Sequence, residues 1–179
     1  MSMASPFELL RDLERQSASG VAALPTEEAQ PDQWAGIVFS LGSLALTAPM
    51  SEVIEAMPVP THVGIPGVKP WALGISNVRG SLLPIFDLHG FLYGRLAETN
   101  KQNRILVTQL GSIFAGLLVS SVTGLRYFDL ANFTDQPPGL PDHVLSPYLT
   151  GAFRDQASYW HVFSPHALIG SPEFFDVAR

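Results

Sequence analysis

Hydrophobic residues in this chain gather in short runs separated by turn residues, a pattern typical of β-strands. Two pairs of runs are each joined by a Gly-Ser dipeptide, at Gly42-Ser43 and at Gly111-Ser112. A two-residue connection that begins with glycine is typical of a type II′ hairpin turn. The four runs are Ile37–Leu41, Leu44–Ala48, Ile105–Leu110 and Ile113–Val119. Two similar hairpins, one early and one midway, predict two similar β units in one chain.

A third strand pair is predicted around Gly80-Ser81. Its strands are Ile75–Arg79 and Leu82–Phe86. Pro84 places the second strand at a sheet edge or a bulge, because proline cannot donate a ladder hydrogen bond. Short strands with turn signals between them favour small barrels over a parallel sheet. The remaining predictions are strands at Val122–Tyr127 and Tyr159–Phe163, a helical turn and strand within Met50–Met57, a loop at Asp135–Pro147 and a short helix at Pro165–Ile169.

The N-terminal residues differ from the rest of the chain. Ser5–Glu8 is a capping box with proline at the first helical position, and it predicts a short amphipathic helix from Pro6 to about Gln16. Ser17–Gln33 contains Gly and Pro and is predicted to be a linker. This divides the chain into an N-terminal helix with its linker (1–33) and a β-rich domain (34–179). The helix has two possible roles, packing on its own domain or binding a partner.

The composition leaves the function open but excludes some classes. Only 15% of the 179 residues are charged, below the roughly 25% of typical soluble domains. Such a surface suits protein partners, and a compact β protein with a large core would give the same composition. The net charge is −6 and the ten Lys and Arg residues are scattered, so nucleic-acid binding is not expected.

Targeting segments, membrane spans and catalytic motifs are the sequence features that bear on location and chemistry. Met1–Arg15 does not resemble a secretory signal, so a cytoplasmic location is expected. Ile105–Val119 is shorter than the ~20 residues that span a bilayer, so direct membrane insertion is not expected. No nucleotide-binding loop, nucleophile elbow or metal-spaced cluster is found, and we therefore expect no catalytic residues, metal or cofactor. A hydrolase that uses Asp87 and His89 is a weak alternative, because this pair has no third partner.

Arg79 is the most unusual residue, a permanent cation among apolar residues and beside a turn. A buried unpaired guanidinium is too costly, so Arg79 should be paired, and Glu55 is a possible partner. We expect a partly desolvated ion pair that ties strands together and lies beside a docking groove. Gly74 indicates a close backbone approach, and Gly80 a positive φ.

The stretch around Arg79 resembles the CheW-like family, the adaptors of bacterial chemosensory arrays. The matching residues are Gly74-Ile75, Asn77–Gly80 and Leu83–Leu88, supported by Phe39–Gly42, Val53–Glu55, Leu110-Gly111 and Tyr148–Gly151. The resemblance implies an all-β fold of two small SH3-like five-stranded barrels packed together, in addition to the short N-terminal helix. The helix at Pro6–Arg11, the linker and Trp71 resemble the variant of this family that serves type IV pilus twitching motility.

The resemblance also implies partners and site residues. Such adaptors join the cytoplasmic tip of a chemoreceptor to the regulatory domain of a CheA-type histidine kinase, at polar membrane-associated arrays, without catalysis. The implied receptor-binding groove comprises Val53, Glu55, Gly74, Asn77, Val78 and Arg79. The implied kinase-binding residues are Phe39, Leu41, Leu44 and Leu46.

Two expectations make these assignments testable. Substituting Arg79 by alanine or Gly74 by aspartate should leave the fold largely intact and weaken receptor coupling. The alternative function is a small-molecule-binding β-barrel, which would need an internal cavity that small barrels normally fill with side chains.

Overall fold

The computed structural model describes residues 33–137, 139, 143–156 and 158–178. The description below concerns the compact unit Gln33–Arg179. The predicted N-terminal helix lies outside the described residues. Within the part that the structure describes, no helix is long and apolar enough to cross a membrane.

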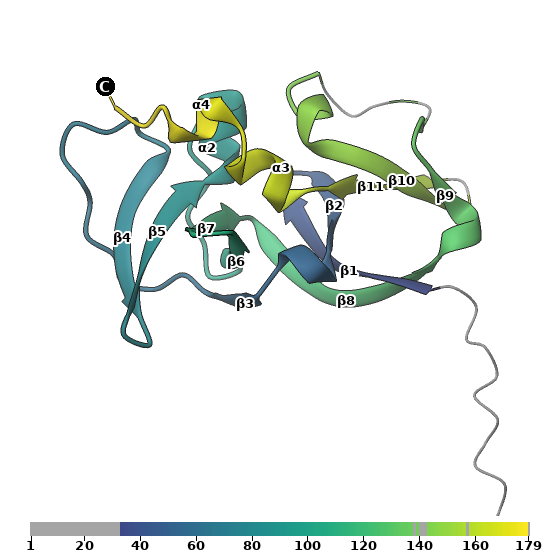
Figure 1. Cartoon of the computed structure of the whole chain (residues 1–179), viewed down its shortest axis with the longest axis horizontal. Coiled ribbons are helices and arrows are strands. Elements are labelled where there is room, and N and C mark those ends of the chain that lie inside the picture. Colours follow the sequence, from purple (N-terminus) through teal and green to yellow (C-terminus); the bar gives the residue numbers. More distant parts are fainter. Residues whose placement is uncertain (1–32, 138, 140–142, 157, 179) are drawn as a thin grey trace, which may run out of the picture. The chain divides into compact units, whose positions relative to one another are not determined.

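Two β-sheets form the domain (Figure 1), and the first has the strand order β8-β1-β2-β11-β10-β9 while the second has the order β3-β6-β7-β5-β4. The strands of the first sheet are β1 Gln33–Leu41, β2 Leu44–Pro49, β8 Ser121–Asp129, β9 Phe133–Thr134, β10 Leu149–Asp155 and β11 Ser158–Phe163. Those of the second are β3 Glu55–Pro58, β4 Ala72–Val78, β5 Ser81–Asp87, β6 Arg104–Leu110 and β7 Ile113–Val119. The short helices are η1 Met50–Glu52, α2 Leu88–Tyr93, η2 Leu130–Asn132, η3 Ser146–Tyr148, α3 Pro165–Ile169 and α4 Pro172–Phe175.

The two sheets repeat one plan, which confirms the predicted pair of similar β units. In each sheet a Gly-Ser hairpin (β1–β2 or β6–β7) is followed in the strand order by a parallel neighbour (β11 or β5). That neighbour is itself in a hairpin with β10 or β4 and leads into a short helix, α3 or α2. The second sheet is continuous in sequence and is inserted between β2 and β8 of the first. The small parallel pairings were not predicted, and the closure of each sheet into an SH3-like barrel stays a prediction.

The first sheet has six strands where five were expected. The additional strand is the two-residue Phe133–Thr134, which pairs with Phe153 and Ala152 of β10. In the second sheet the equivalent place is held by a single bridge between Val63 and β4. The two sheets are therefore more similar to one another than their six and five strands suggest.

The residues with positive φ show where each hairpin turn lies and which type it is. Gly42 (φ 61°) and Gly111 (φ 59°) are each followed by a serine with negative φ, as the predicted type II′ turns require. The third turn is Arg79-Gly80, one residue earlier than predicted, because both residues have positive φ (50° and 86°). Two consecutive positive φ values are the signature of a type I′ turn, and they place Arg79 at the tip of the β4–β5 hairpin.

Pro84 was predicted to place its strand at a sheet edge or a bulge, and the sheet edge is wrong. The β4–β5 pairing does contain a bulge, between Ala72 and Gly74, opposite Phe86 and Ile85. The strand of Pro84, β5, lies between β4 and β7. Pairing with β7 begins only at Ile85, one residue after the proline. The side of β5 at Pro84 that faces away from β4 therefore has no ladder partner, and the missing N–H costs no hydrogen bond.

Three hydrophobic clusters form the core. The central cluster draws residues from both sheets, including Phe39, Leu106 and Phe163, and from α3, which Figure 1 shows crossing between the sheets. A second cluster contains only residues of the second sheet and the segments packed on it, including Leu83. The third lies within the first sheet, around Phe153. Each fully buried side chain of this size contributes about 1.5–3 kcal/mol to stability.

The buried residue His161 in β11 gives a pH prediction. It is 7% exposed, and its Nδ1 has no hydrogen-bond partner among the described residues. Burial lowers the pKa of His161 below its ordinary value of 6.5. The unfolded chain therefore binds this proton near pH 6.5, whereas the folded chain does not. Urea unfolding should show full stability above about pH 6.5 and a progressive loss as the pH falls below it.

The control for this prediction removes the imidazole. H161N should flatten the loss of unfolding free energy between pH 7 and pH 5.5, whereas the same change at the exposed His143 should leave it intact. An unchanged pH slope in H161N would show that another group causes the acid sensitivity.

Candidate docking surfaces

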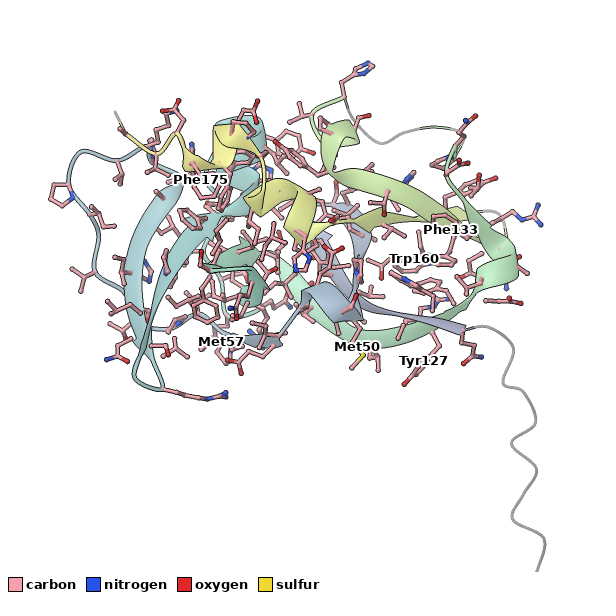
Figure 2. The ribbon with its side chains drawn as sticks, in the orientation of Figure 1. Met50, Met57, Tyr127, Phe133, Trp160 and Phe175 are labelled. Atoms are coloured by element: carbon pink, nitrogen blue, oxygen red, sulfur yellow. The ribbon has the colours of Figure 1, made fainter. Side chains whose placement is uncertain are left out.

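An exposed apolar surface begins on the edge strand β8. Leu125 lies opposite Ile37 of β1, and Tyr127 lies opposite Ala35, so these side chains share the face of the sheet that turns away from the third cluster. Met50 directly follows β2 and extends the same face. Tyr127 is 61% exposed, and Leu125 and Met50 are exposed as well. Figure 2 shows Met50 and Tyr127 on the same side of the ribbon.

Beyond η1, the edge strand β3 and the residue before it carry further exposed apolar side chains. Met57 packs on the second cluster and Glu55 lies on the same face as Met57, so Ile54 and Ala56 point to the opposite, outward face. Both outward residues are exposed. Exposed apolar patches of this kind mark interaction sites in soluble proteins. We define the β3–β8 surface as Met50, Ile54, Ala56, Leu125 and Tyr127.

The predicted ion pair between Arg79 and Glu55 is confirmed, with 2.9 Å between the guanidinium nitrogen and the carboxylate oxygen. It connects the tip of the β4–β5 hairpin with β3, which is at the other end of the strand order, so the second sheet curves back on itself. The Arg79 side chain is 81% exposed and that of Glu55 is 26% exposed. The expectation of a desolvated pair is therefore wrong for Arg79, and such a pair contributes about 0–1 kcal/mol.

Two further residues of the predicted groove support this hairpin tip. The side-chain oxygen of Asn77 accepts a hydrogen bond from the backbone N–H of Gly80 at 2.9 Å and closes the turn. Val78 packs on the second cluster, and Val53 packs on the central one. The structure thus brings Glu55, Asn77, Val78 and Arg79 together, with Val53 at the start of β3.

Gly74 lies apart from these residues and is buried. Its φ is 144°, and a Cβ atom here would overlap the carbonyl oxygen of Val63, which pairs with Ile75 through two backbone hydrogen bonds. The predicted close backbone approach is confirmed. The expectation that aspartate at position 74 leaves the fold intact is wrong, because no side chain fits there.

A second exposed apolar surface covers the outward face of the β4–β5 hairpin. Val63, Ile75 and Pro84 lie in one cross-strand row, and Leu82 follows in the next row opposite Asn77. Directly opposed residues point to the same face of a sheet. Val63 is 75% exposed and Leu82 is 68% exposed. We define the β4–β5 surface as Val63, Ile75, Leu82 and Pro84.

The implied kinase-binding residues are mostly in the core. Phe39, Leu41 and Leu46 are at most 3% exposed and belong to the central cluster. They cannot contact a partner in the folded protein, and their assignment to a binding edge is corrected accordingly. Leu44 is partly exposed beside the first turn, but it also packs against the central cluster.

The side chains of Asp87 and His89 bind backbone groups rather than one another. The two carboxylate oxygens of Asp87 accept hydrogen bonds from the N–H groups of Gly90 (2.9 Å) and Ala97 (2.7 Å). Nδ1 of His89 donates to the carbonyl oxygen of Arg95 at 2.6 Å. Asp87 therefore caps α2 and holds the following loop, and the hydrolase alternative loses its geometric basis.

Several residues of the two surfaces were not predicted as site residues. Met50, Leu125, Tyr127 and Leu82 all lie in segments whose secondary structure the sequence indicated. The alternation in β8, where Thr123, Leu125 and Tyr127 are exposed, is a signal for one outward face. The sequence does not reveal which of the two faces is covered by the other sheet.

Comparison with known proteins identifies the family. The model of the CheW-like domain matches residues 35–173. The chain is 42% identical over 174 residues to Protein PilI of Pseudomonas aeruginosa, covering 97% of each chain. It is 30% identical over 127 residues to Protein FrzA of Myxococcus xanthus, covering 71% of this chain and 78% of that one.

The fold is similar to that of a solved structure. The scaffolding protein TtCheW from Thermoanaerobacter tengcongensis superimposes with a TM-score of 0.67 at 22% identity, over 78% of this chain and 94% of that one. The sequence match and the shared fold agree over the β-rich domain. The chain therefore belongs to the CheW-like family, and within that family it is similar to PilI.

Proposed function

We propose that this protein is a non-enzymatic adaptor that couples a chemoreceptor to a CheA-type histidine kinase in a bacterial chemosensory array. The observation that carries the proposal is the presence of two separate exposed apolar surfaces on a CheW-like domain. An adaptor needs one surface for each partner, and the β3–β8 and β4–β5 surfaces supply them. The similarity to PilI favours an array that controls type IV pilus twitching motility, at a cytoplasmic, membrane-associated and polar location.

The cytoplasmic tip of the receptor is assigned to the β3–β8 surface. Val53 and Glu55 are chain neighbours of Ile54, and Glu55 pairs with the Arg79 guanidinium, which is exposed and therefore able to orient a charged partner. Apolar contacts would supply most of the affinity, concentrated in a few central side chains such as Tyr127. Gly74 is assigned a structural role in the hairpin, because it is buried against Val63, and not a contact with the receptor.

The regulatory domain of the kinase is assigned to the β4–β5 surface. Its apolar residues lie on the outward face of the β4–β5 hairpin, whose strands carry none of the residues of the β3–β8 surface. Leu82 and Val63 are the most exposed of its residues. Separate surfaces allow both partners to bind one adaptor at the same time.

The alternative of a small-molecule-binding barrel has less support. The space enclosed by the second sheet is filled by its own cluster, which includes Leu83, Ile85 and Val107. The first sheet is likewise filled around Phe128 and Phe153. A ligand inside either sheet would have to displace close-packed side chains.

Charged substitutions on the two surfaces should separate the two binding activities. In capture assays with a receptor cytoplasmic fragment and a kinase regulatory domain, Y127D should weaken receptor binding at least tenfold and leave kinase binding intact. L82D should do the reverse. Burying an unpaired carboxylate in an apolar contact costs more than the ~1.4 kcal/mol that corresponds to tenfold.

Each variant is the control for the other, and thermal unfolding checks that both remain folded. R79A should weaken receptor binding less than Y127D, because the exposed arginine orients rather than anchors. If Y127D and L82D reduce both activities equally, the assignment of separate surfaces is wrong. Retention of both activities in both variants would refute the adaptor surfaces altogether.

A further inference from the structure

The chain crosses between the two sheets twice, and the crossings differ in length. From β2 to β3 it runs through Met50–Ile54, which includes η1. From β7 to β8 it passes through Ser120 alone. Because the strands on both sides of these crossings are equivalent in the repeat, the two places can be compared directly.

At the first crossing, a carboxylate of the chain fills the space between the sheets. Oε2 of Glu52 accepts hydrogen bonds from the hydroxyl of Ser164 at 2.7 Å and from the backbone N–H of His166 at 2.9 Å. The carbonyl oxygen of Glu52 accepts a hydrogen bond from the hydroxyl of Thr108 in β6 at 2.8 Å. Glu52 thus joins the end of the first sheet to the second sheet.

The second crossing lies beside a strand-to-helix segment that is equivalent to the one beside the first crossing. At the end of β5 the chain reads Phe86-Asp87-Leu88-His89, and at the end of β11 it reads Phe163-Ser164-Pro165-His166. Both segments lie where a parallel strand ends and a short helix begins. His89 is therefore the counterpart of His166, and Ser120 takes the place of the longer segment that contains Glu52.

The single residue Ser120 leaves this place open. A pocket of about 400 Å³ lies here. Its lining includes Ser40, Ser120 and Ser121 from the first sheet and its crossing, His89 from α2, and Arg95 and Asn100 from the α2–β6 connection. This volume is within the roughly 300–1,000 Å³ of small-molecule sites. The pocket therefore lies at the crossing that is equivalent to that of Glu52, and its lining includes His89, the counterpart of His166. The counterpart of Ser164 is Asp87, whose two carboxylate oxygens already accept hydrogen bonds from Gly90 and Ala97.

Several groups of the lining can donate hydrogen bonds. The Ser120 hydroxyl oxygen accepts from the N–H of Gly42 at 2.8 Å, so its own proton can still be donated. The hydroxyls of Ser40 and Ser121 are 2.7 Å apart, and one of them donates to the other while the second keeps its proton. Arg95 is a permanent cation, and Glu98 is the carboxylate in the lining.

We propose that the pocket at Ser120 binds a small carboxylate-bearing molecule. Its carboxylate would take the place that the Glu52 side chain holds at the first crossing, with serine hydroxyls and the Arg95 guanidinium as donors. A charged donor paired with a carboxylate gives the stronger class of hydrogen bond. Because the lining comes from both halves of the repeat, the bound molecule ties the two sheets together.

The test uses the full-length protein and named probes, and it does not depend on the proposed adaptor function. Amide NMR titrations with citrate, succinate and acetate should show saturable shifts for Ser120, Ser121 and His89. In R95Q the affinity should fall at least tenfold. R154Q removes the same charge from the exposed β10 residue and should leave binding unchanged.

Three results would overturn the proposal. One is the absence of saturable shifts at these residues with any of the carboxylates up to about 10 mM, the limit of weak specific binding. The second is an equal loss of binding in R95Q and R154Q, which would indicate general charge attraction. The third is saturable binding of inorganic phosphate at this pocket without binding of the carboxylates, which would show a site for a different anion.

Discussion

Replacing Gly74 with alanine should destabilise the fold by about 3 kcal/mol or more. A Cβ at this position overlaps the carbonyl oxygen of Val63, and the φ of 144° is strained for any residue with a side chain. Relief would require Val63 to move away from Ile75 and lose the two backbone hydrogen bonds that join the 58–71 segment to β4. The free energy of unfolding, measured in urea, should fall accordingly.

Gly67 offers the matched control. It also has a positive φ, 75°, but no atom lies within 4 Å of the place where its Cβ would be. G67A should therefore show the conformational penalty alone, about 1 kcal/mol. Equal losses in G74A and G67A would show that the overlap with Val63 is relieved without cost, and would return Gly74 to the candidate receptor contacts.

The first sheet also contains a glycine with positive φ that lies against a neighbouring carbonyl oxygen, as Gly74 does in the second sheet. Gly151 in β10 has a φ of 150°, and a Cβ there would lie 2.6 Å from the carbonyl oxygen of Thr134 in β9. Gly151 and Gly74 therefore perform the same role in equivalent strands, where a short neighbouring segment approaches too closely for any side chain. Both glycines lie in the segments that carry the family resemblance, and the structure gives them a structural reason.

Local signals predicted most of the strands. The Gly-Ser hairpins have the predicted bounds to within a few residues, and Pro165–Ile169 is the predicted helix. The longest missed elements are β10 and α2, and each contains a glycine, Gly151 or Gly90, that weakens the local pattern. They form through pairing with the next strand, β11, and through the Asp87 cap, and hydrophobic periodicity reports neither kind of contact.

The candidate site was predicted less well than the fold. The Arg79–Glu55 pair follows from the cost of an unpaired cation, and the structure contains it. The apolar residues were harder to assign, because alternation identifies two faces of a strand without showing whether both are covered. Strand β1 is covered on both faces, by the third cluster at Val38 and by the central cluster at Phe39. Strand β8 and the β4–β5 hairpin instead each present exposed apolar residues, including Tyr127 and Leu82.

Truncating Phe39 to alanine should lower the unfolding free energy by about 3–5 kcal/mol. Its ring is 1% exposed and packs edge-on against Phe163 at a centroid distance of 5.9 Å, joining β1 to β11 in the centre of the domain. At about 2–4 °C per kcal/mol, the melting temperature should fall by roughly 6–20 °C. Binding of the kinase regulatory domain, measured well below that temperature, should be unchanged.

Leu44 provides the comparison within the same hairpin. It is only partly buried, so L44A should cost less than F39A, about 1 kcal/mol. A loss of kinase affinity in folded F39A with little loss of stability would mean that β1 opens to expose its core face to the partner. That outcome would be costly because β1 is buried on both faces. Opening β1 would also break the packing of the central cluster. A stability loss without an affinity loss instead directs the search for the kinase contact to Leu82.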